Sequence, residues 1–180
     1  RRVLFRSDPN TAAVPGSVAI DWFVPSRDGR LVALSISTNG SELGTLRIHD
    51  TVTGTALADA IPRVHGPTAG GSAAWNADGT VLYYTRYPAP GERPDADLHF
   101  FQQVYAHRLG RPVAEDTYET GREFPRIAEI QLQSSPDGRW LHASVANGDG
   151  GEFAHHLRDP GGQWRAIAGF QDAVVAAEFG

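Results

Sequence analysis

The sequence predicts an all-β chain, and more specifically a partial β-propeller built from repeated four-stranded antiparallel sheets. The first observation is a phrase that occurs three times: SRDG at residues 26–29, NADG at 76–79 and SPDG at 135–138, each followed by an apolar run. An Asp-Gly pair between apolar runs favours a β-hairpin, because a tight two-residue turn needs a positive φ that Gly adopts without steric cost. The second observation is the spacing, since the three aspartates follow one another at intervals of 50 and 59 residues. Such intervals fit propeller blades and are too long for leucine-rich or ankyrin repeats.

The first repeat is predicted to span residues 17–61 and to contain four strands, which is the number in one propeller blade. Two apolar runs flank the first Asp-Gly turn, and a third run alternates apolar and polar residues with a period of two. A second turn at Thr53-Gly54 returns the chain into the fourth strand. The strands are expected at residues 18–24, 31–37, 45–49 and 56–61.

The second and third repeats, residues 72–120 and 127–170, show the same order of strands and turns. Proline and glycine over residues 88–95 predict an inserted loop, which accounts for the longer second interval. Apart from a short piece near residues 97–105, no stretch has an apolar face at helical spacing. Strands are expected at residues 72–75, 81–87, 103–108 and directly after the turn at 109–111, then at 129–133, 140–145, 152–157 and 163–168.

Both ends of the sequence depart from the repeat. Residues 1–7 read like translated adapter sequence or a short frayed strand, and we expect them to take no part in the fold. Residues 173–179 begin like another opening strand, and the sequence stops at Gly180 before the turn that follows each earlier copy. We therefore expect a propeller segment over residues 8–180, with the start of a fourth blade at 173–180. A β-sandwich is the alternative fold, although a sandwich does not require a four-strand unit to recur.

Composition and charge argue against several classes of protein. The formal net charge of −5 argues against a nucleic-acid-binding surface. No apolar run reaches membrane-spanning length, and no signal peptide is recognisable, so we expect no membrane partner. The absence of cysteine excludes disulfides and thiolate metal ligands, and it leaves the compartment open between cytoplasm and periplasm.

No catalytic or cofactor motif is predicted in the chain. The nearest approach to the G-x-S-x-G nucleophile elbow is GGSAA at residues 70–74, which lacks the final glycine and precedes a strand where a helix is required. NGDGGE at residues 147–152 resembles the start of a calcium loop, but the bidentate acid of the twelfth position would be Arg158. The glycines there also lack the spacing and the following helix of a dinucleotide site. We interpret both segments as polar connections between strands.

The seven histidines are not predicted to bind a metal. His155 and His156 are neighbours in the sequence, so in a strand their side chains point to opposite faces. The helical HExxH pattern is absent. The remaining histidines are scattered, and we expect each to be a half-exposed strand residue: His49, His65, His99, His107 and His142.

The aromatic side chains are predicted to fill the space between sheets rather than to form a binding platform. They are Trp22, Trp75, Trp140 and Trp164, with Tyr83, Tyr84, Tyr87 and Tyr105. The arginines alternate with acids, which indicates a mixed solvated surface and no nucleic-acid partner. They are Arg86, Arg93, Arg108, Arg111, Arg122 and Arg126.

Several segments, taken in order, resemble one family of serine peptidases. They are Asp8-Pro9-Asn10, GSE at 40–42 with TLRI at 45–48, Thr53-Gly54 with LAD at 57–59, Ala74-Trp75 with Asp78-Gly79 and YTRYP at 84–88, and VYAHRLG at 104–110. Their order and spacing are similar to those of the prolyl oligopeptidases, in particular the bacterial members. The resemblance covers residues 8–180.

The resemblance implies a seven-bladed propeller inserted between an N-terminal segment and a C-terminal α/β-hydrolase domain. This chain would hold about three blades and the first strand of the next. In that family, a Ser-Asp-His triad of the hydrolase domain cleaves short peptides after proline, and the propeller restricts access to small substrates. Some members place an aromatic residue of the substrate cavity shortly before the Ala-Trp pair, where this chain has Gly70. No catalytic, substrate-binding, cofactor or metal residue is therefore assigned here.

The leading functional hypothesis is a segment of a serine endopeptidase that is inactive alone and acts as the lid and size filter of the whole enzyme. Its expected partners are its own C-terminal hydrolase domain and short peptides, with no cofactor. Two alternatives stay open: a non-enzymatic propeller that binds peptides or proteins on one face, and an enzyme like oligopeptidase B or acylaminoacyl-peptidase.

Overall fold

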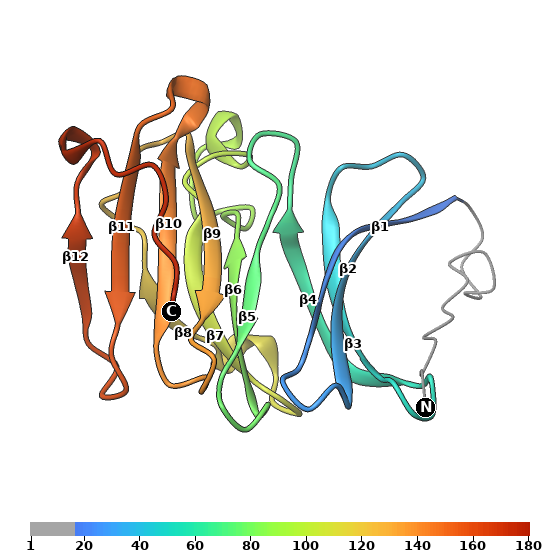
Figure 1. Ribbon diagram of the computed structural model, residues 1–180. Helices are drawn as coiled ribbons and strands as arrows, with labels where there is room; N and C mark the ends of the chain where they lie inside the picture. Colours follow the sequence, from blue (N-terminus) through green and yellow to red (C-terminus); the bar gives the residue numbers. More distant parts are fainter. Residues whose placement is uncertain (1–16) are drawn as a thin grey trace.

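The structure, a computed structural model that describes residues 17–180, contains three four-stranded antiparallel sheets standing side by side (Figure 1). In each sheet the strands pair in the order in which they occur in the sequence. This arrangement confirms the predicted fold class. The predicted lead at residues 1–7 and the Asp8-Pro9-Asn10 segment lie outside the described residues.

The strands lie close to where the sequence predicts them. The first sheet is β1 (Val18–Pro25), β2 (Leu31–Thr38), β3 (Gly44–Asp50) and β4 (Ala56–His65). The second sheet is β5 (Ala73–Trp75), β6 (Val81–Arg86), β7 (Gln103–Arg108) and β8 (Thr117–Thr120). The third sheet is β9 (Ala128–Ser134), β10 (Leu141–Asn147), β11 (Phe153–Arg158) and β12 (Trp164–Ala168). Short 3-10 turns are η2 (Asp95–Asp97), η3 (Val113–Glu115), η4 (Gly148–Gly150) and η5 (Phe170–Asp172).

The Asp-Gly phrases form the hairpins that they predict, but through loops of four residues rather than two. In the first, the Ser26 N–H donates to the Leu31 carbonyl oxygen at 2.8 Å, which closes the loop over residues 27–30. The glycine alone supplies the positive φ, with values of 71°, 70° and 69° at Gly29, Gly79 and Gly138. The aspartate accepts the backbone N–H two residues on, at 3.0 Å from Arg30 to Asp28. The extra residues relieve the constraint of a two-residue turn, which explains why one glycine suffices.

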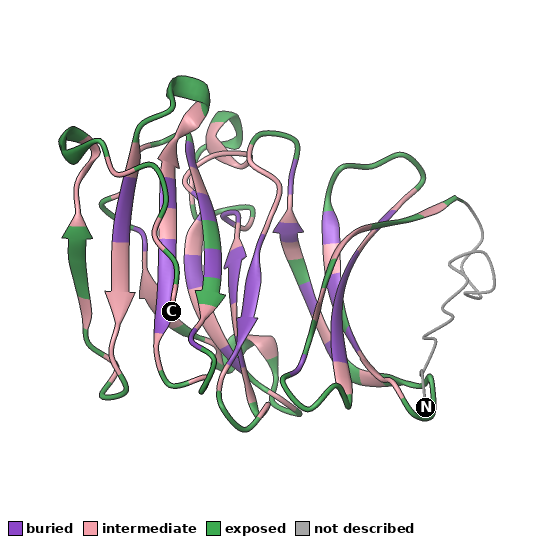
Figure 2. Ribbon diagram, viewed as in Figure 1, coloured by how far each residue is buried: buried purple, intermediate pink, exposed green. Residues whose placement is uncertain are grey.

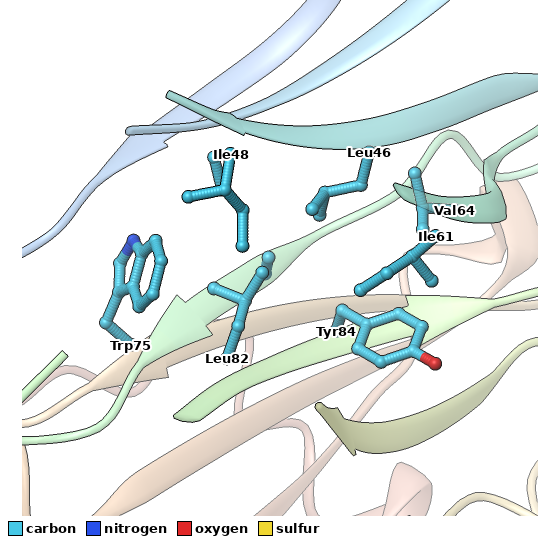
Figure 3. Close-up of a cluster of buried hydrophobic side chains, with 9 residues drawn as sticks. Leu46, Ile48, Ile61, Val64, Trp75, Leu82 and Tyr84 are labelled. Carbon is cyan, nitrogen blue, oxygen red and sulfur yellow. The ribbon is translucent and has the colours of Figure 1, made fainter. Parts of the chain in front are cut away.

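Packing between the sheets forms two separate cores. The first core lies between the first and second sheets, where Leu46, Ile48, Ile61 and Val64 meet Trp75, Leu82 and Tyr84 (Figure 3). The second core lies between the second and third sheets and contains the following buried side chains: Ala74, Val104, Ala128, Ile130, Leu132, Leu141, Ala143 and Val145. Because side chains alternate across a strand, Ala74 faces one core while Trp75 faces the other. The buried residues follow the middle sheet and the facing sides of its neighbours (Figure 2).

Three elements differ from the sequence-based prediction. β8 begins at Thr117 rather than directly after the turn at 109–111, because Pro112 precedes the 3-10 turn η3. β4 extends to His65 through a register shift, with Arg63 at a φ of 62°. Residues 173–180 form no strand, since none of the described residues provides a neighbouring strand with which they would pair. They instead lie against the outer face of the third sheet, where the Val174 carbonyl oxygen accepts a hydrogen bond from His155 Nε2 at 2.9 Å.

No helix in the part of the chain that the structure describes is long and apolar enough to cross a membrane.

Candidate functional site

The first strands of the three sheets converge on one cavity of about 340 Å³. The end of β1 contributes Val24 and Pro25, β5 contributes all three of its residues, and the end of β9 contributes Leu132 and the two residues that follow. These are equivalent positions of the three repeats, because each is an opening strand that runs into its Asp-Gly turn. The repeat itself therefore builds the cavity.

Hydrogen bonds hold the first strands together around this cavity. The buried Trp75 donates through Nε1 to the Val24 carbonyl oxygen at 3.0 Å, which joins β5 to β1. Ser134 Oγ donates to the Trp75 carbonyl oxygen at 2.6 Å, which joins β9 to β5. These bonds fix the relative positions of the three opening strands more narrowly than apolar contact alone, since hydrogen bonds are directional.

The cavity has a largely apolar lining that carries a few polar side chains. Its polar side chains belong to Arg27, Asn76, Gln133, Ser134 and Ser135, and no carboxylate or imidazole lines it. General acid–base catalysis needs a group that can exchange a proton near neutral pH, which these side chains do not offer. The cavity offers hydrogen-bonding groups and one positive charge, but it contains no reactive pair.

A second polar cluster lies buried between the first and second sheets. His107 on β7 has both ring nitrogens against carboxylates: Nδ1 lies 2.6 Å from Asp116 Oδ1, and Nε2 lies 2.9 Å from Asp59 Oδ1. Burial acts to lower the pKa of His107, but the hydrogen bonds and charges of Asp116 and then Asp59 outweigh it, and the pKa is raised above 6.5. Burial and the hydrogen bond to Asp116 raise the pKa of Tyr84, so its hydroxyl stays protonated and donates to Asp116 Oδ2 at 2.7 Å.

The histidines are more buried than the sequence predicts. His107, His142 and His155 are buried, so the expectation of half-exposed strand histidines is wrong for His107 and His142. The opposite orientation of the neighbours is confirmed, because His155 stacks on His142 while His156 contacts Phe124. His49, His65 and His99 lie apart from these clusters, and His49 and His65 are half-buried. Among the described residues, no three His, Asp or Glu side chains are placed to hold a metal ion.

The two loop segments that resemble catalytic or calcium motifs serve as connections. Ser72 of the GGSAA segment is buried, and its Oγ accepts the Leu132 N–H at 2.9 Å. A Cβ on Gly71 would lie 1.8 Å from the Val64 carbonyl oxygen, which explains the glycine by close packing. The NGDGGE segment contains η4 and a left-handed Gly151, with the Asn147 amide donating to Glu152 at 3.1 Å.

The aromatic and arginine side chains are more closely coupled than predicted. Trp75, Tyr84 and Tyr87 are buried, as expected of core residues. Arg108, Arg111, Arg122 and Arg126 are exposed, as expected of a solvated surface, whereas Arg86 and Arg93 are half-buried. Four of the six arginines also stack on aromatic rings: Arg86 on Tyr105, Arg93 on Phe101, Arg122 on Tyr118 and Arg126 on Phe100. The contacts of Arg93 with Phe101 and of Arg126 with Phe100 involve the insertion between β6 and β7, so these two stabilise the loop that the proline and glycine pattern predicts.

Sequence reasoning missed the Asp59, His107 and Asp116 cluster, although two of its residues lie in segments that carry the family resemblance. Asp59 ends LAD at 57–59, and His107 lies in VYAHRLG at 104–110. The structure brings them together and adds a hydrogen bond of 2.6 Å from the Gly110 N–H to Asp59 Oδ1. The two residues are 48 positions apart, and nothing in either segment indicates the other, so no sequence signal predicted the contact.

Comparison with known proteins identifies the family. A family profile described as "Prolyl oligopeptidase, N-terminal beta-propeller domain" matches residues 2–171. An uncharacterised peptidase, y4qF, of Sinorhizobium fredii is 32% identical over 173 residues, which is 89% of this chain and 21% of that protein. The prolyl endopeptidase of Elizabethkingia meningoseptica is 28% identical over 178 residues, which is 95% of this chain and 24% of that protein.

Solved structures show the same fold. One from a study of two prolyl endopeptidases has a TM-score of 0.72 and 28% identity, and the match covers 93% of this chain and 22% of that one. Oligopeptidase B of Leishmania major has a TM-score of 0.67 and 19% identity, over 89% of this chain and 21% of that one. The chain thus spans less than a quarter of the length of each of these relatives. With nearly its whole length matched by the family profile, the chain belongs to the prolyl oligopeptidase family and corresponds to part of its N-terminal β-propeller domain.

Proposed function

We propose that this chain is the part of a serine endopeptidase that controls which peptides reach the catalytic site, in a whole protein that hydrolyses short peptides after proline. The observation that carries the proposal is the match of residues 2–171 to a propeller domain of prolyl oligopeptidases. The names of the relatives, a peptidase and a prolyl endopeptidase, support the reaction. The chain alone is inactive in this proposal, and its partner is a C-terminal α/β-hydrolase domain of the same polypeptide.

The arrangement of the first strands of the three sheets supports a role in controlling which peptides reach the catalytic site. Their shared cavity is lined mostly by apolar residues, carries no reactive pair and is bounded by three equivalent strand ends. In a closed propeller, equivalent strand ends surround a central channel. A channel a few side chains wide admits a flexible peptide and excludes a folded protein. Enclosure of the catalytic site also keeps water away from the reacting groups.

The test uses the whole protein that carries this chain. Its substrates are a proline-containing peptide of about ten residues and the same sequence displayed in an exposed loop of a folded protein, which is the preferred site of ordinary proteolysis. We expect cleavage after proline in the peptide, no cleavage of the loop, and loss of activity after acylation of the catalytic serine.

Each other outcome identifies a different function. Absence of cleavage with binding of the peptide would overturn the peptidase and favour a scaffold. Cleavage after basic residues, or release of acylated amino acids, would favour an enzyme like oligopeptidase B or acylaminoacyl-peptidase. Equal cleavage of the peptide and the folded loop would overturn the role in access and leave the peptidase in place.

A further inference from the structure

We propose that Asp59, His107 and Asp116 form a protonation-dependent lock that holds the first sheet against the second. We call these three residues the interface lock. Asp59 lies on β4 of the first sheet, His107 on β7 of the second, and Asp116 between η3 and β8. The proposal does not depend on the peptidase function, because it concerns only the contact between two sheets.

The lock is the polar centre of an otherwise apolar interface. Ile61 on β4 and Tyr84 on β6 belong to the apolar core between the same two sheets. The His107 side chain is fully buried, and those of Asp59 and Asp116 are 3% and 4% exposed. Apolar contact has no preferred direction, whereas two hydrogen bonds to opposite sides of one ring are directional and fix the register. The interface lock therefore fixes the position of β4 relative to the second sheet.

Counting donors and acceptors shows which protonation state the geometry requires. A carboxylate oxygen only accepts, and a neutral imidazole has one N–H donor and one acceptor nitrogen. Both nitrogens of His107 face carboxylate oxygens, at 2.6 and 2.9 Å. Each carboxylate already accepts another donor: the Gly110 N–H for Asp59, and the Tyr84 hydroxyl for Asp116. An imidazolium with two N–H donors satisfies every partner, while a neutral ring leaves one nitrogen lone pair against a carboxylate.

Loss of the proton weakens the lock on one side of the ring. Without the second ring proton, one nitrogen of His107 and one carboxylate oxygen would face each other as two acceptors, in a site from which water is excluded. Such an unsatisfied buried pair is destabilising. A buried ion pair is sensitive in the same way, because removal of one charge leaves the other uncompensated. The expected response is a loosening of β4 from the second sheet.

The surrounding charges set the direction of the pH dependence. Asp59 and Asp116 face the ring directly, and Tyr84 reaches it through Asp116. Cavities beside Asp116 are lined by further charged groups: Arg63, Arg86, Glu92, Arg108, Arg111 and Glu115. With the pKa of His107 raised in the folded state, the lock contributes fully below 6.5, the pKa of an ordinary histidine, and its contribution is lost as the pH rises through the folded-state pKa.

The first experiment measures the protonation state of the His107 ring by NMR of the whole protein labelled with 15N-histidine. The signal of His107 is identified because it disappears in the variant His107→Gln. We expect two protonated ring nitrogens at neutral pH. Asp59→Asn keeps the acceptor for Gly110 but removes one charge, so it should lower the pKa of His107 by about one to three units. One unprotonated ring nitrogen at neutral pH, or an unchanged pKa in Asp59→Asn, would overturn the proposal.

The second experiment measures hydrogen exchange of β4, corrected for the intrinsic pH dependence of exchange, with β10 of the third sheet as the internal reference. We expect protection of β4 to fall as the pH rises above about 6.5, while that of β10 stays level over the same range. Asp59→Asn should lose this pH dependence, and His49→Gln, on the same sheet but outside the lock, should retain it. Equal pH dependence of β4 in wild type and Asp59→Asn would contradict the lock, even if His107→Gln does not fold.

Discussion

Arg158 on β11 donates through Nε to Glu119 Oε2 on β8 at 2.7 Å, joining the third sheet to the second. Trp164 Nε1 on β12 donates to the same oxygen at 3.0 Å. The two charged side chains are 19% and 11% exposed, so the pair is largely shielded from solvent. Burial acts to lower the pKa of Arg158, but the hydrogen bond to Glu119 outweighs it and raises the pKa. The ion pair of Arg158 with Glu119 is therefore a charged link between the second sheet and the third sheet.

Replacement of this carboxylate should weaken the contact between the second and third sheets. Glu119→Gln keeps an oxygen for Trp164 but removes the charge that Arg158 faces, and we expect a loss of about 1–3 kcal/mol in the free energy of unfolding. Denaturant unfolding of the whole protein measures it. The control is Asp97→Asn, which breaks a pair with Arg126 whose side chains are 45% and 23% exposed. That change should cost less than about 1 kcal/mol, and equal losses in both variants would contradict the interpretation.

Two equivalent glycines should respond differently to alanine. Gly29 and Gly138 have the same left-handed backbone, with φ of 71° and 69°. A Cβ on Gly29 meets nothing within 4 Å, whereas one on Gly138 would lie 2.5 Å from Cα of Ala77 in the neighbouring Asp-Gly turn. We expect Gly29→Ala to cost about 1–2 kcal/mol from backbone strain alone. Gly138→Ala should cost about 1–3 kcal/mol more, because the two turns must separate. Thermal unfolding of both variants tests the difference, and equal melting temperatures would exclude close packing of the turns.

The buried pair His142 and His155 should make the third sheet sensitive to acid. His155 Nε2 donates to the Val174 carbonyl oxygen at 2.9 Å, and its Nδ1 lies 3.0 Å from His142 Nε2, so a single proton lies between the two stacked rings. Burial, then His155 and His156, lower the pKa of His142 below 6.5.

The pH dependence has the opposite sign from that of the interface lock. Because the pKa of His142 is lowered in the folded state, its stabilisation is complete above 6.5 and is lost as the pH falls toward the folded-state value. Hydrogen exchange of β10 should therefore increase as the pH falls below about 6.5, and His142→Asn should flatten this response. A β10 response that is unchanged in His142→Asn would refute the assignment.

Residues 8–180 produced alone should associate. β1 of the first sheet and β12 of the third carry exposed apolar side chains, among them Phe23 at 65% and Ile167 at 49% exposure. Exposed apolar side chains of this kind favour association in water. Size-exclusion chromatography should show oligomers, and the double variant Phe23→Ser with Ile167→Ser should raise the monomer fraction. Val52→Ser, which changes a 78% exposed residue in a hairpin loop, is the control and should have little effect. A monomer with a cooperative thermal transition would contradict this expectation.

The sequence predicted the strands because their determinants are local. Alternation of apolar and polar residues and the Asp-Gly turns act over a few positions, and eleven of the strands formed where these patterns lie, with β8 displaced by the turn after Pro112. Residues 173–179 have the same local pattern but formed no strand, because pairing depends on a neighbour that local sequence does not specify. The family resemblance correctly identified the prolyl oligopeptidase propeller.

The polar clusters were beyond prediction for a related reason. Asp59 and His107 are 48 positions apart, and nothing at either position indicates the other. His142 was expected to be half-exposed, yet it and His155 lie on a face that the segment at Val174 covers. Burial of a strand face depends on what packs against it, so the alternation of residues indicates two faces without stating which is covered.

The middle position of the second sheet makes the chain behave as a short one-dimensional array. Among the described residues, each outer sheet shares one core with a neighbour, while the second shares two. Nearest-neighbour coupling then predicts unequal tolerance to damage. Melting of the first sheet leaves the contact between the other two intact, whereas melting of the second removes both contacts together, so substitutions in β5 to β8 should propagate furthest along the array.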